Sequence, residues 1–269
     1  MIELSAIHRD YSVGDQAVRA LDGVDLSIAS GEYLSVMGPS GSGKSTLLNI
    51  VALLDRPTAG RYRIDGRDVT ELSERELARL RRENFGFVFQ FFHLIPRLTA
   101  AENVEMPLVL AGIAPVERVA RVAEALASVG LADRAGHRPD QLSGGQRQRA
   151  AIARATILRP GVLLADEPTG NLDSASGREI VQLLESLNAG GTTLIVITHD
   201  AALGERARRQ IRLADGMIVS DSDDRLPLLE KGGTGSGSGE TFGADNAPGS
   251  LLRREGEQGS CGTPVDAPR

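Results

Sequence analysis

Short apolar runs, each followed by a glycine or a polar residue, divide most of the chain. Residues 1–35 alternate apolar and polar positions, which predicts short, half-exposed strands. Residues 33–37, 85–89, 162–165 and 192–198 are nearly continuous apolar runs, which are typical of strands buried on both faces of a sheet. Helical patterns separate these runs, so the chain order is that of βαβ units around a parallel sheet.

The helical patterns come in two groups. Those next to the apolar runs cover residues 47–54, 74–82 and 176–187. Residues 96–160 are predicted to be mainly helical and inserted between strands, with one helix at 102–112 and an amphipathic helix ending at Gly130. The amphipathic helix should place four apolar side chains on one face: Val119, Val122, Leu126 and Val129. A strand over 61–64 leads into the hairpin-type turn Asp65-Gly66.

The pattern changes at about residue 221. Residues 221–269 are rich in Gly, Ser, Asp and Pro and have no apolar period, which predicts a disordered tail after a domain at 1–220. Within the tail, Leu251-Leu252-Arg253-Arg254 is either a docking motif or simply solvated chain.

Composition excludes several classes of protein. The 269 residues are 41% apolar and 25% charged, as in an ordinary globular protein. The net charge of −6 gives no electrostatic argument for binding nucleic acid. A single cysteine, Cys261, excludes an internal disulfide framework and a multi-cysteine metal site. No apolar run is long enough to span a membrane and the N-terminus has no signal-type segment, so we expect a cytoplasmic protein.

The first candidate site follows the run at 33–37. Gly38-Pro39-Ser40-Gly41-Ser42-Gly43-Lys44-Ser45-Thr46 fits G-x-x-x-x-G-K-[ST], with a predicted strand before it and a helix after it. The glycines allow close backbone approach, and the first N–H groups of the helix attract phosphate. Lys44 supplies a charge for the β- and γ-phosphates, and the Ser45 hydroxyl can ligate Mg²⁺. A chance glycine-rich turn is the alternative, but the strand–loop–helix order favours a nucleotide site.

Three further polar positions each follow an apolar run: Gln90, the pair Asp166-Glu167, and His199. Ligands bind beyond the carboxyl ends of parallel strands, so these residues should meet the phosphate loop at one edge of the sheet. Phosphoryl transfer to water would then use Asp166 in the Mg²⁺ shell and Glu167 as general base. Gln90 can bond the water and the metal, and His199 can donate to the γ-phosphate. Alone, paired acids after a strand are as often helix caps or ion-pair partners.

Two other features allow more than one interpretation. Leu142-Ser143-Gly144-Gly145-Gln146 opens a helix with the spacing of a capping box and leaves helix N–H groups uncovered. It is therefore either an anion site or an ordinary capped helix. Tyr11 lies beside a turn and is either surface or a platform for a nucleotide base.

Taken in order, these segments resemble the motif set of ABC-type ATPases. The resemblance rests on Gly38–Thr46, Gln90, Leu142–Gln146, Leu163–Glu167, Asn171-Leu172-Asp173 and His199, and it covers about residues 1–220. It implies an α/β P-loop NTPase fold: a RecA-like parallel sheet core, an N-terminal antiparallel β-subdomain and an inserted helical subdomain at about 96–160.

The same resemblance implies a head-to-tail homodimer. Ser143, Gly144, Gly145 and Gln146 of one copy would close over ATP held by Lys44 of the other. Tyr11 would stack on the adenine, and Asp173 would cross the dimer interface.

A narrower resemblance connects residues 89–108 and 166–173 to the macrolide-exporter and lipoprotein-releasing branch. That branch implies an ATPase chain that works with a separate integral membrane permease, on the inner face of the cell membrane. The segment after Gln90 would receive the permease. Phe91 departs from the branch, which usually has a polar residue there, and it adds apolar surface at this contact.

The sequence thus predicts an ATP-hydrolysing ABC transporter subunit that drives a permease. A second class keeps the ATPase but uses a permease-like partner to switch cell-wall hydrolases, without transport. A third class, soluble ABC proteins acting on DNA or ribosomes, generally joins two ATPase units or inserts a coiled coil. This chain shows one unit, no heptad run and no basic patch.

Overall fold

The computed structural model describes residues 1–14 and 16–223, which lie in the first of the two units, Met1–Pro227 and Leu228–Arg269, into which the chain divides. The predicted tail, apart from residues 221–223, lies outside the described residues, and so does its Leu251–Arg254 motif. Within the described part of the chain, no helix combines the length and the apolar character needed to cross a bilayer.

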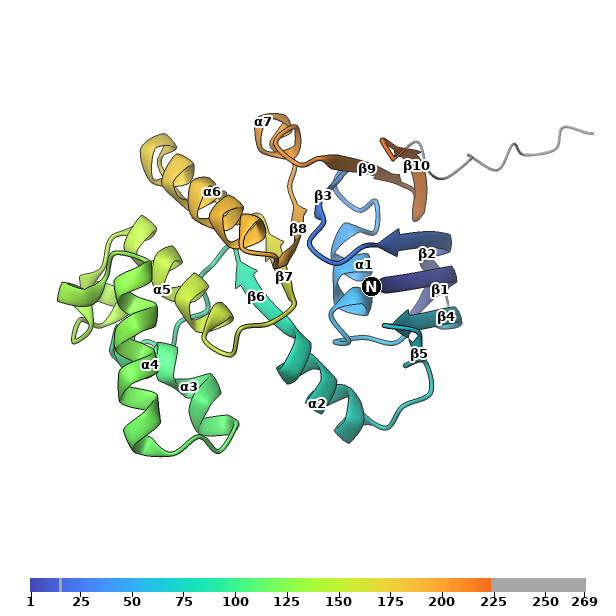
Figure 1. The fold of residues 1–269 in the computed structure, drawn as a ribbon. Coiled ribbons are helices and arrows are strands. Elements are labelled where there is room, and N and C mark those ends of the chain that lie inside the picture. The colour runs from blue at the N-terminus through green and yellow to red at the C-terminus, as the bar shows by residue number, and fades with distance from the viewer. Residues whose placement is uncertain (15, 224–269) are drawn as a thin grey trace, which may run out of the picture. The chain divides into compact units, whose positions relative to one another are not determined.

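A six-stranded sheet forms the centre of the first unit (Figure 1). Its strands, in spatial order, are β10 (Met217–Asp221), β9 (Arg209–Ala214), β3 (Tyr33–Met37), β8 (Thr193–Ile197), β7 (Val162–Asp166) and β6 (Phe85–Phe89). All neighbouring pairs are parallel except β9 and β10. The four apolar runs of the sequence are therefore adjacent parallel strands, as predicted. The β9–β10 hairpin was not predicted.

The second sheet is antiparallel and contains β1 (Ile2–Val13), β2 (Gln16–Ile28), β4 (Ala59–Ile64) and β5 (Arg67–Asp68). The prediction of short strands at the N-terminus was wrong, because β1 and β2 have 12 and 13 residues. Shifts in the register between Leu4 and Asp10 let the alternation restart within β1, so one long strand looks like several short ones. Asp65 and Gly66 both have positive φ, as the predicted hairpin turn requires.

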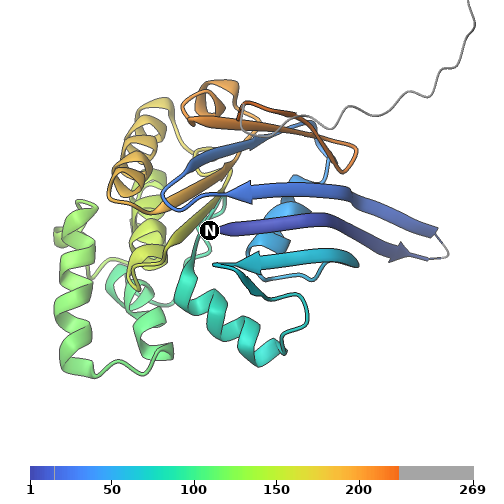
Figure 2. The ribbon, with the colours of Figure 1, turned by 45° about the vertical axis from the view of Figure 1, so that its right-hand side comes forward.

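Helix α1 (Lys44–Val51) lies between the two sheets (Figures 1 and 2). One buried cluster joins its apolar face to β1 and to the central strands through Leu4, Ile50 and Ile195. The other face of the central sheet packs against α5 (Gly144–Thr156) and α6 (Ser174–Ala189). Alternate residues of the central strands reach opposite faces, as in the pair Leu163 and Leu164, which explains their continuous apolar pattern.

The remaining helices lie at the edges. Helix α2 (Glu74–Asn84) precedes β6, and the short α7 (Ala201–Gly204) follows β8. Helices α3 (Ala100–Leu110) and α4 (Pro115–Ser128) pack with α5 in a third cluster, and the 3-10 turns Ala132–Arg134 and Pro139–Gln141 lie between α4 and α5.

One residue of the amphipathic helix α4 differs from the prediction. Val122, Leu126 and Val129 are buried, but Val119 is 71% exposed. The period was correct, but Val119 lies one turn closer to the start of the helix and does not belong to the cluster that α3 and α5 complete.

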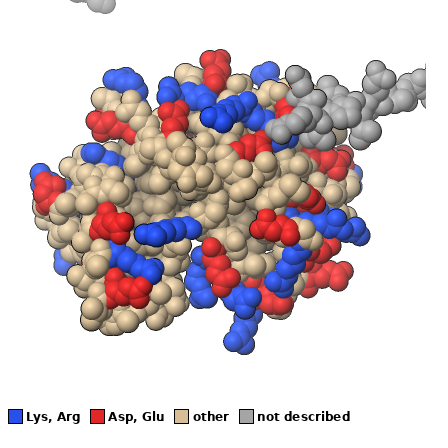
Figure 3. All heavy atoms as spheres, viewed as in Figure 1, with Lys and Arg blue, Asp and Glu red and all other residues tan. Residues whose placement is uncertain are grey.

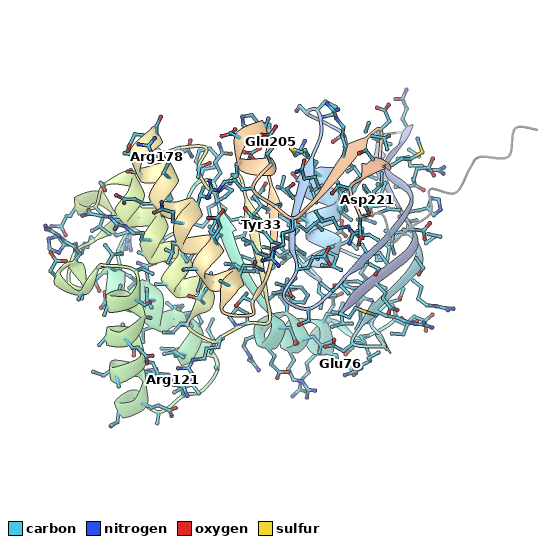
Figure 4. The ribbon with its side chains drawn as sticks, turned by 45° about the horizontal axis from the view of Figure 1, so that its top comes forward. Tyr33, Glu76, Arg121, Arg178, Glu205 and Asp221 are labelled. Atoms are coloured by element: carbon cyan, nitrogen blue, oxygen red, sulfur yellow. The ribbon has the colours of Figure 1, made fainter. Side chains whose placement is uncertain are left out.

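The surface carries both signs of charge. On the face drawn in Figure 3, basic and acidic side chains are interspersed around the rim, and the centre is largely uncharged. The side chains in Figure 4 include Tyr33, which begins β3 and is 5% exposed among residues of α6 and the sheet.

Candidate active site

The phosphate loop connects β3 to α1, as the motif predicted. Gly38 and Gly43 have φ of +154° and +100°. A Cβ at Gly38 would lie 2.1 Å from the carbonyl oxygen of Leu213, and one at Gly43 would lie 2.4 Å from that of Ala20. The loop is thus enclosed by β2 and β9, and these two positions accept only glycine.

The start of α1 is suited to an anion. Gly43 is the N-cap residue and no side chain caps the helix, so its first N–H groups lack a side-chain acceptor. The Lys44 ammonium donates to the carbonyl oxygens of Gly38 at 2.9 Å and Pro39 at 2.7 Å. Ser45 is exposed, whereas the Ser42 hydroxyl is buried and lacks a hydrogen-bond partner among the described residues.

Asp166 ends β7 and lies close enough to Lys44 for their charges to interact. Burial, together with the neighbouring charge of Glu167, raises the pKa of Asp166 above its ordinary value, although Lys44 opposes this shift. The negative charges of Asp166 and Glu167 thus lie close together in a partly buried position, and Lys44 balances them only in part. A divalent cation would supply the missing positive charge.

Glu167 is fixed by the next strand. Its φ of +46° is unusual for a residue with a side chain, and its N–H donates to the carbonyl oxygen of Ile197 at 2.9 Å. One carboxylate oxygen accepts the backbone N–H of His199 at 2.9 Å and contacts its Nδ1 at 2.6 Å. The other oxygen accepts the Thr198 hydroxyl at 3.3 Å. The glutamate is thereby joined to the end of β8.

The contact sets which ring nitrogen of His199 faces the carboxylate as a donor. An ionised carboxylate only accepts hydrogen bonds, so Nδ1 carries the proton that faces Glu167. Nε2 can then donate to another group only if the ring is doubly protonated. The His199 side chain is 75% exposed and the Glu167 side chain 16%, so the ring lies open to solvent above a mostly covered carboxylate.

Gln90 follows β6 and lies beside the loop after Glu167. The Asn171 side chain donates to the Gln90 carbonyl oxygen at 3.0 Å, and a Cβ at Gly170 would lie 2.8 Å from the Gln90 amide nitrogen. The structure therefore brings Gln90, Asp166, Glu167 and His199 to the same edge of the sheet as the phosphate loop, on the adjacent strands β6, β7, β8 and β3.

The segment after Gln90 is strained. Phe92 and His93 have φ of +60° and +48°. The guanidinium of Arg154, on α5, donates to their carbonyl oxygens at 3.0 and 2.5 Å. Arg147 lies 4.9 Å from the centre of the Phe92 ring, which adds a cation–π contact. Two arginines of α5 therefore fix this segment.

Helix α5 begins with the predicted capping box, in which Ser143 accepts the backbone N–H of Gln146 and the Gln146 side chain accepts that of Ser143. A Cβ at Gly145 would lie 2.9 Å from the hydroxyl of Ser176, at the start of α6. Asp173 caps α6 by accepting from Ala175 and Ser176, which lowers its pKa. Across residues 1–14 and 16–223, no hydrogen bond or ion pair joins Ser143–Gln146 to the phosphate loop.

Tyr11 lies near the end of β1, half-buried, and its hydroxyl donates to Asp55 at 2.7 Å. The prediction had named the ring but not this partner. Thr198 and Arg154 were also missed, and Asn171 was named as a motif residue but not as a partner of Gln90. Thr198 directly precedes His199, and that proximity was the available signal.

The comparisons with known proteins identify the family of the chain. The family described as ABC transporter matches residues 21–170. The macrolide export ATP-binding/permease protein MacB of Marinobacter nauticus is 54% identical over 230 residues, which are 86% of this chain and 36% of that protein. MacB of Rhodopseudomonas palustris is 54% identical over 82% of this chain and 34% of its own length. The chain thus spans about a third of the length of these curated relatives.

The match to one solved structure extends over nearly all of that structure's chain. The dimeric, post-hydrolysis structure of the ATP-binding cassette MJ0796 bound to ADP and Pi is 46% identical, with a TM-score of 0.76 over 82% of this chain and 97% of that chain. This likeness confirms the predicted P-loop NTPase fold. The chain belongs to the ABC transporter family and is an ATP-binding cassette of it.

Proposed function

We propose that this chain binds and hydrolyses ATP and uses the cycle to drive a membrane permease. The observation that carries the proposal is the convergence at one sheet edge of the phosphate loop, the Asp166–Glu167 pair and His199. Each has a separate task in phosphoryl transfer to water, and no covalent intermediate is needed.

The loop and α1 bind the phosphates. The uncapped N–H groups at the start of α1 and the buried Ser42 hydroxyl provide donors around an anion. Lys44 exchanges its two loop carbonyl partners for the β- and γ-phosphate oxygens, and because a charged acceptor replaces neutral ones, this exchange favours the bound state.

The residues also fit a magnesium ion. Ser45, Gln90 and Asp166 are all oxygen donors, and the raised pKa of Asp166 marks a place short of positive charge. Among residues 1–14 and 16–223 there is no cluster of three or more His, Cys, Asp or Glu placed to hold a metal. The three oxygen ligands Ser45, Gln90 and Asp166 suit Mg²⁺, which binds few protein ligands and completes its coordination shell with phosphates and water. The ion supplies charge neutralisation at the phosphates when bound.

Glu167 acts as the general base. Its position after β7, its strained backbone and its bonds to Thr198 and His199 fix the carboxylate toward the γ-phosphate side of the loop. One carboxylate oxygen takes the proton of the attacking water. His199 orients the glutamate through Nδ1 and, when doubly protonated, donates from Nε2 to the γ-phosphate.

The complete site requires a second copy. Ser143–Gln146 begin α5 away from the phosphate loop of their own chain, with N–H groups suited to an anion. In a head-to-tail homodimer they face the γ-phosphate bound to the partner's Lys44. Asp173 then lies at the dimer interface, and Tyr11 lies at the adenine base of the nucleotide. The similar cassette MJ0796 was solved as a dimer with ADP and Pi, which supports this arrangement.

The permease contact follows Gln90. Phe91 and Ile95 are 69% and 41% exposed in a segment that Arg154 joins to α5, so an apolar contact there reaches the helix that begins with the Ser143–Gln146 motif. The relatives are named as macrolide export ATP-binding/permease proteins, which favours transport over a switch for cell-wall hydrolases. In those relatives the ATP-binding and permease parts share one protein, so we assign the permease to no particular chain. The ATPase then works at the inner face of the cell membrane.

The test compares the full chain with Glu167→Gln, Lys44→Ala and, as a control, the exposed Glu179→Gln. With ATP and Mg²⁺, Glu167→Gln should slow hydrolysis by about 100-fold or more while ATP still binds and the dimer accumulates in light scattering. Lys44→Ala should lose ATP binding, and Glu179→Gln should behave as the parent. Equal hydrolysis by Glu167→Gln and the parent would remove Glu167 as the base.

A further inference from the structure

Two side chains of β1, Arg9 and Tyr11, contact Asp55 in the loop after α1, and the proposed function has used only Tyr11. The Tyr11 hydroxyl donates to Oδ2 of Asp55 at 2.7 Å, and Nε of Arg9 donates to the same oxygen at 2.9 Å. The Arg9 guanidinium carbon also lies 4.4 Å from the centre of the Tyr11 ring. Arg9 and Tyr11 are two residues apart on β1 and so share a face of the strand.

The carboxylate is connected to the phosphate-loop helix. Asp55 comes four residues after α1 ends, and its backbone N–H donates to the carbonyl oxygen of Asn49 in that helix at 3.1 Å. Its second carboxylate oxygen, Oδ1, accepts the backbone N–H of Arg56 at 2.8 Å. Asp55 therefore joins Tyr11 to the far end of the helix that begins at Lys44.

The position of Tyr11 suits the base of a nucleotide. Tyr11 pairs with Val18 on β2, two residues before Ala20. The carbonyl oxygen of Ala20 is the atom that a Cβ at Gly43 would meet at 2.4 Å, so β2 lies directly against the phosphate loop. At about 3.3 Å per strand residue, Val18 lies roughly 7 Å along β2 from that contact. The Tyr11 ring therefore lies about as far from the phosphate loop as the base of a nucleotide lies from its phosphates.

The trio also favours stacking. The carboxylate accepts from both neighbours, and the Asp55 and Arg9 side chains are only 25% and 24% exposed. Burial alone would raise the pKa of Asp55, but the bonds from Tyr11, the Arg56 backbone and Arg9 lower it below its ordinary value, so the group stays ionised at neutral pH. Arg9 covers one face of the Tyr11 ring, which leaves the other face for a planar π-system.

We propose that Arg9 and Asp55 are positioning residues for nucleotide recognition, which hold the Tyr11 ring so that its free face receives the purine base of ATP. This inference rests on the proposed function, since it requires phosphates in the loop. Neither residue touches the nucleotide, because both act through the tyrosine. Their effect therefore depends on the base and not on the phosphates.

The experiment uses two probes in Mg²⁺: ATP, and inorganic tripolyphosphate, which lacks a base. Dissociation constants are measured by calorimetry for the full chain, Arg9→Gln, Asp55→Asn, Asp55→Ala, Tyr11→Phe and Tyr11→Ala. Tyr11→Ala should raise the dissociation constant for ATP by roughly 10-fold, which corresponds to the loss of one stacked base. The dissociation constant for tripolyphosphate should stay within about twofold of the parental value. Asp55→Ala and Arg9→Gln should weaken ATP by about three- to fivefold and should also spare tripolyphosphate.

The decisive comparison is a double variant. In a Tyr11→Ala background, adding Asp55→Ala should cause no further loss of ATP affinity, because the residue acts only through the ring. A merely structural ion pair would weaken both probes, and equally on either background. Asp55→Asn keeps the shape of the side chain, so it tests the same point if Asp55→Ala fails to fold.

Arg19→Gln is the matched control. Arg19 on β2 pairs with Asp10 on β1 at 3.0 Å, but that pair contacts no aromatic ring that the structure shows for residues 1–14 and 16–223. Both probes should bind Arg19→Gln as they bind the parent.

Tyrosine fluorescence gives a second readout. The chain has three tyrosines and no tryptophan, and Tyr33 and Tyr62 are buried at 5% and 2% exposure. ATP, but not tripolyphosphate, should change the tyrosine emission, and Tyr11→Phe should abolish that change.

Two failures are distinguishable. If the parent binds neither probe, the proposed function fails and this inference with it. If the parent binds both, and the Asp55 and Arg9 variants leave the ratio of the two dissociation constants unchanged, only the positioning inference is overturned.

Discussion

The phosphate loop and the segment after Gln90 lie at the same edge of the central sheet, separated by β8 and β7, but different contacts hold them. Backbone atoms enclose the loop: Gly38 and Gly43 face the carbonyl oxygens of Leu213 and Ala20. Turn contacts add to this, since Gly216 donates to Ser42 and Asp22 donates to Gly216. The loop therefore has little freedom to change shape.

The segment after Gln90 is held by side chains instead. Arg154 and Arg147 reach it from α5, and Asn171 reaches the carbonyl oxygen of Gln90. Two of its apolar side chains, Phe91 and Ile95, are 69% and 41% exposed. Side-chain contacts can break and reform without disturbing a sheet, so this segment suits a moving part, whereas the loop suits a fixed binding site.

The largest effect should come from adding one methyl group to the loop. Gly43→Ala places a Cβ against the Ala20 carbonyl and forces alanine to a φ of +100°. We expect a cost of roughly 3 kcal/mol or more, seen as a loss of ATP affinity of at least about 100-fold. Calorimetry with ATP and Mg²⁺ measures it.

Gly41→Ala provides the control, since Gly41 has a φ of +79° but no atom within 4 Å of an added Cβ. It carries only the backbone strain, about 1–2 kcal/mol. Equal losses from the two alanines would mean that the enclosure of the loop has no consequence for binding.

A smaller effect should follow from releasing the segment after Gln90. Arg154→Met removes both bonds to the strained Phe92 and His93 carbonyls while keeping the buried apolar stem. Burial lowers the pKa of this guanidinium, and its only bonds among the described residues are to these carbonyls. We expect a loss of about 1–3 kcal/mol in local stability. Trypsin should then cut after the exposed Arg97 about 10-fold faster, as followed by mass spectrometry.

Arg159→Met serves as the comparison for this variant. The Arg159 side chain is 86% exposed and pairs with Glu124 at 3.8 Å, so its loss should not change cleavage at Arg97. If Arg154→Met is cut no faster than the parent, the two bonds do not restrain the segment.

The same two regions explain what sequence alone could predict. The loop, the strands before it and the residues after β6, β7 and β8 were located because each signal is local: a fixed spacing or a continuous apolar run. The β9–β10 hairpin that encloses the loop was missed, although Asp215-Gly216, both with positive φ, is a turn signal of the same kind as Asp65-Gly66.

Contacts between residues that are distant in the sequence have no local sequence signal. Asp55 lies 44 residues from Tyr11, and Arg154 lies 61 from His93, so only the pairing of elements in space reveals them. Val119 shows the converse, since its position in the helical period is correct but no neighbouring helix covers it. Local patterns determine which face an element can bury, and the fold determines whether a partner is present.

The smallest effect should come from the hydroxyl of Thr198, which lies between the two regions at the end of β8. The side chain is fully buried, donates to Glu167 at 3.3 Å and accepts the backbone N–H of Asp200 at 3.0 Å. Thr198→Val keeps the volume but leaves Glu167 with His199 as its orienting partner, and the long bond to Glu167 indicates a modest role. We expect kcat for ATP hydrolysis to fall about threefold with little change in KM, since the phosphate contacts are untouched.

Thr198→Ser distinguishes orientation from packing, because it keeps the hydroxyl and removes the methyl group. The serine variant should retain the parental kcat, although a small cavity lowers its unfolding free energy by about 1 kcal/mol. If serine and valine lower kcat equally, the hydroxyl does not orient Glu167, and His199 with the backbone of β8 suffices to hold the base. If only valine lowers it, the Thr198 hydroxyl orients the Glu167 carboxylate, and the end of β8 thereby fixes the position of the proposed general base.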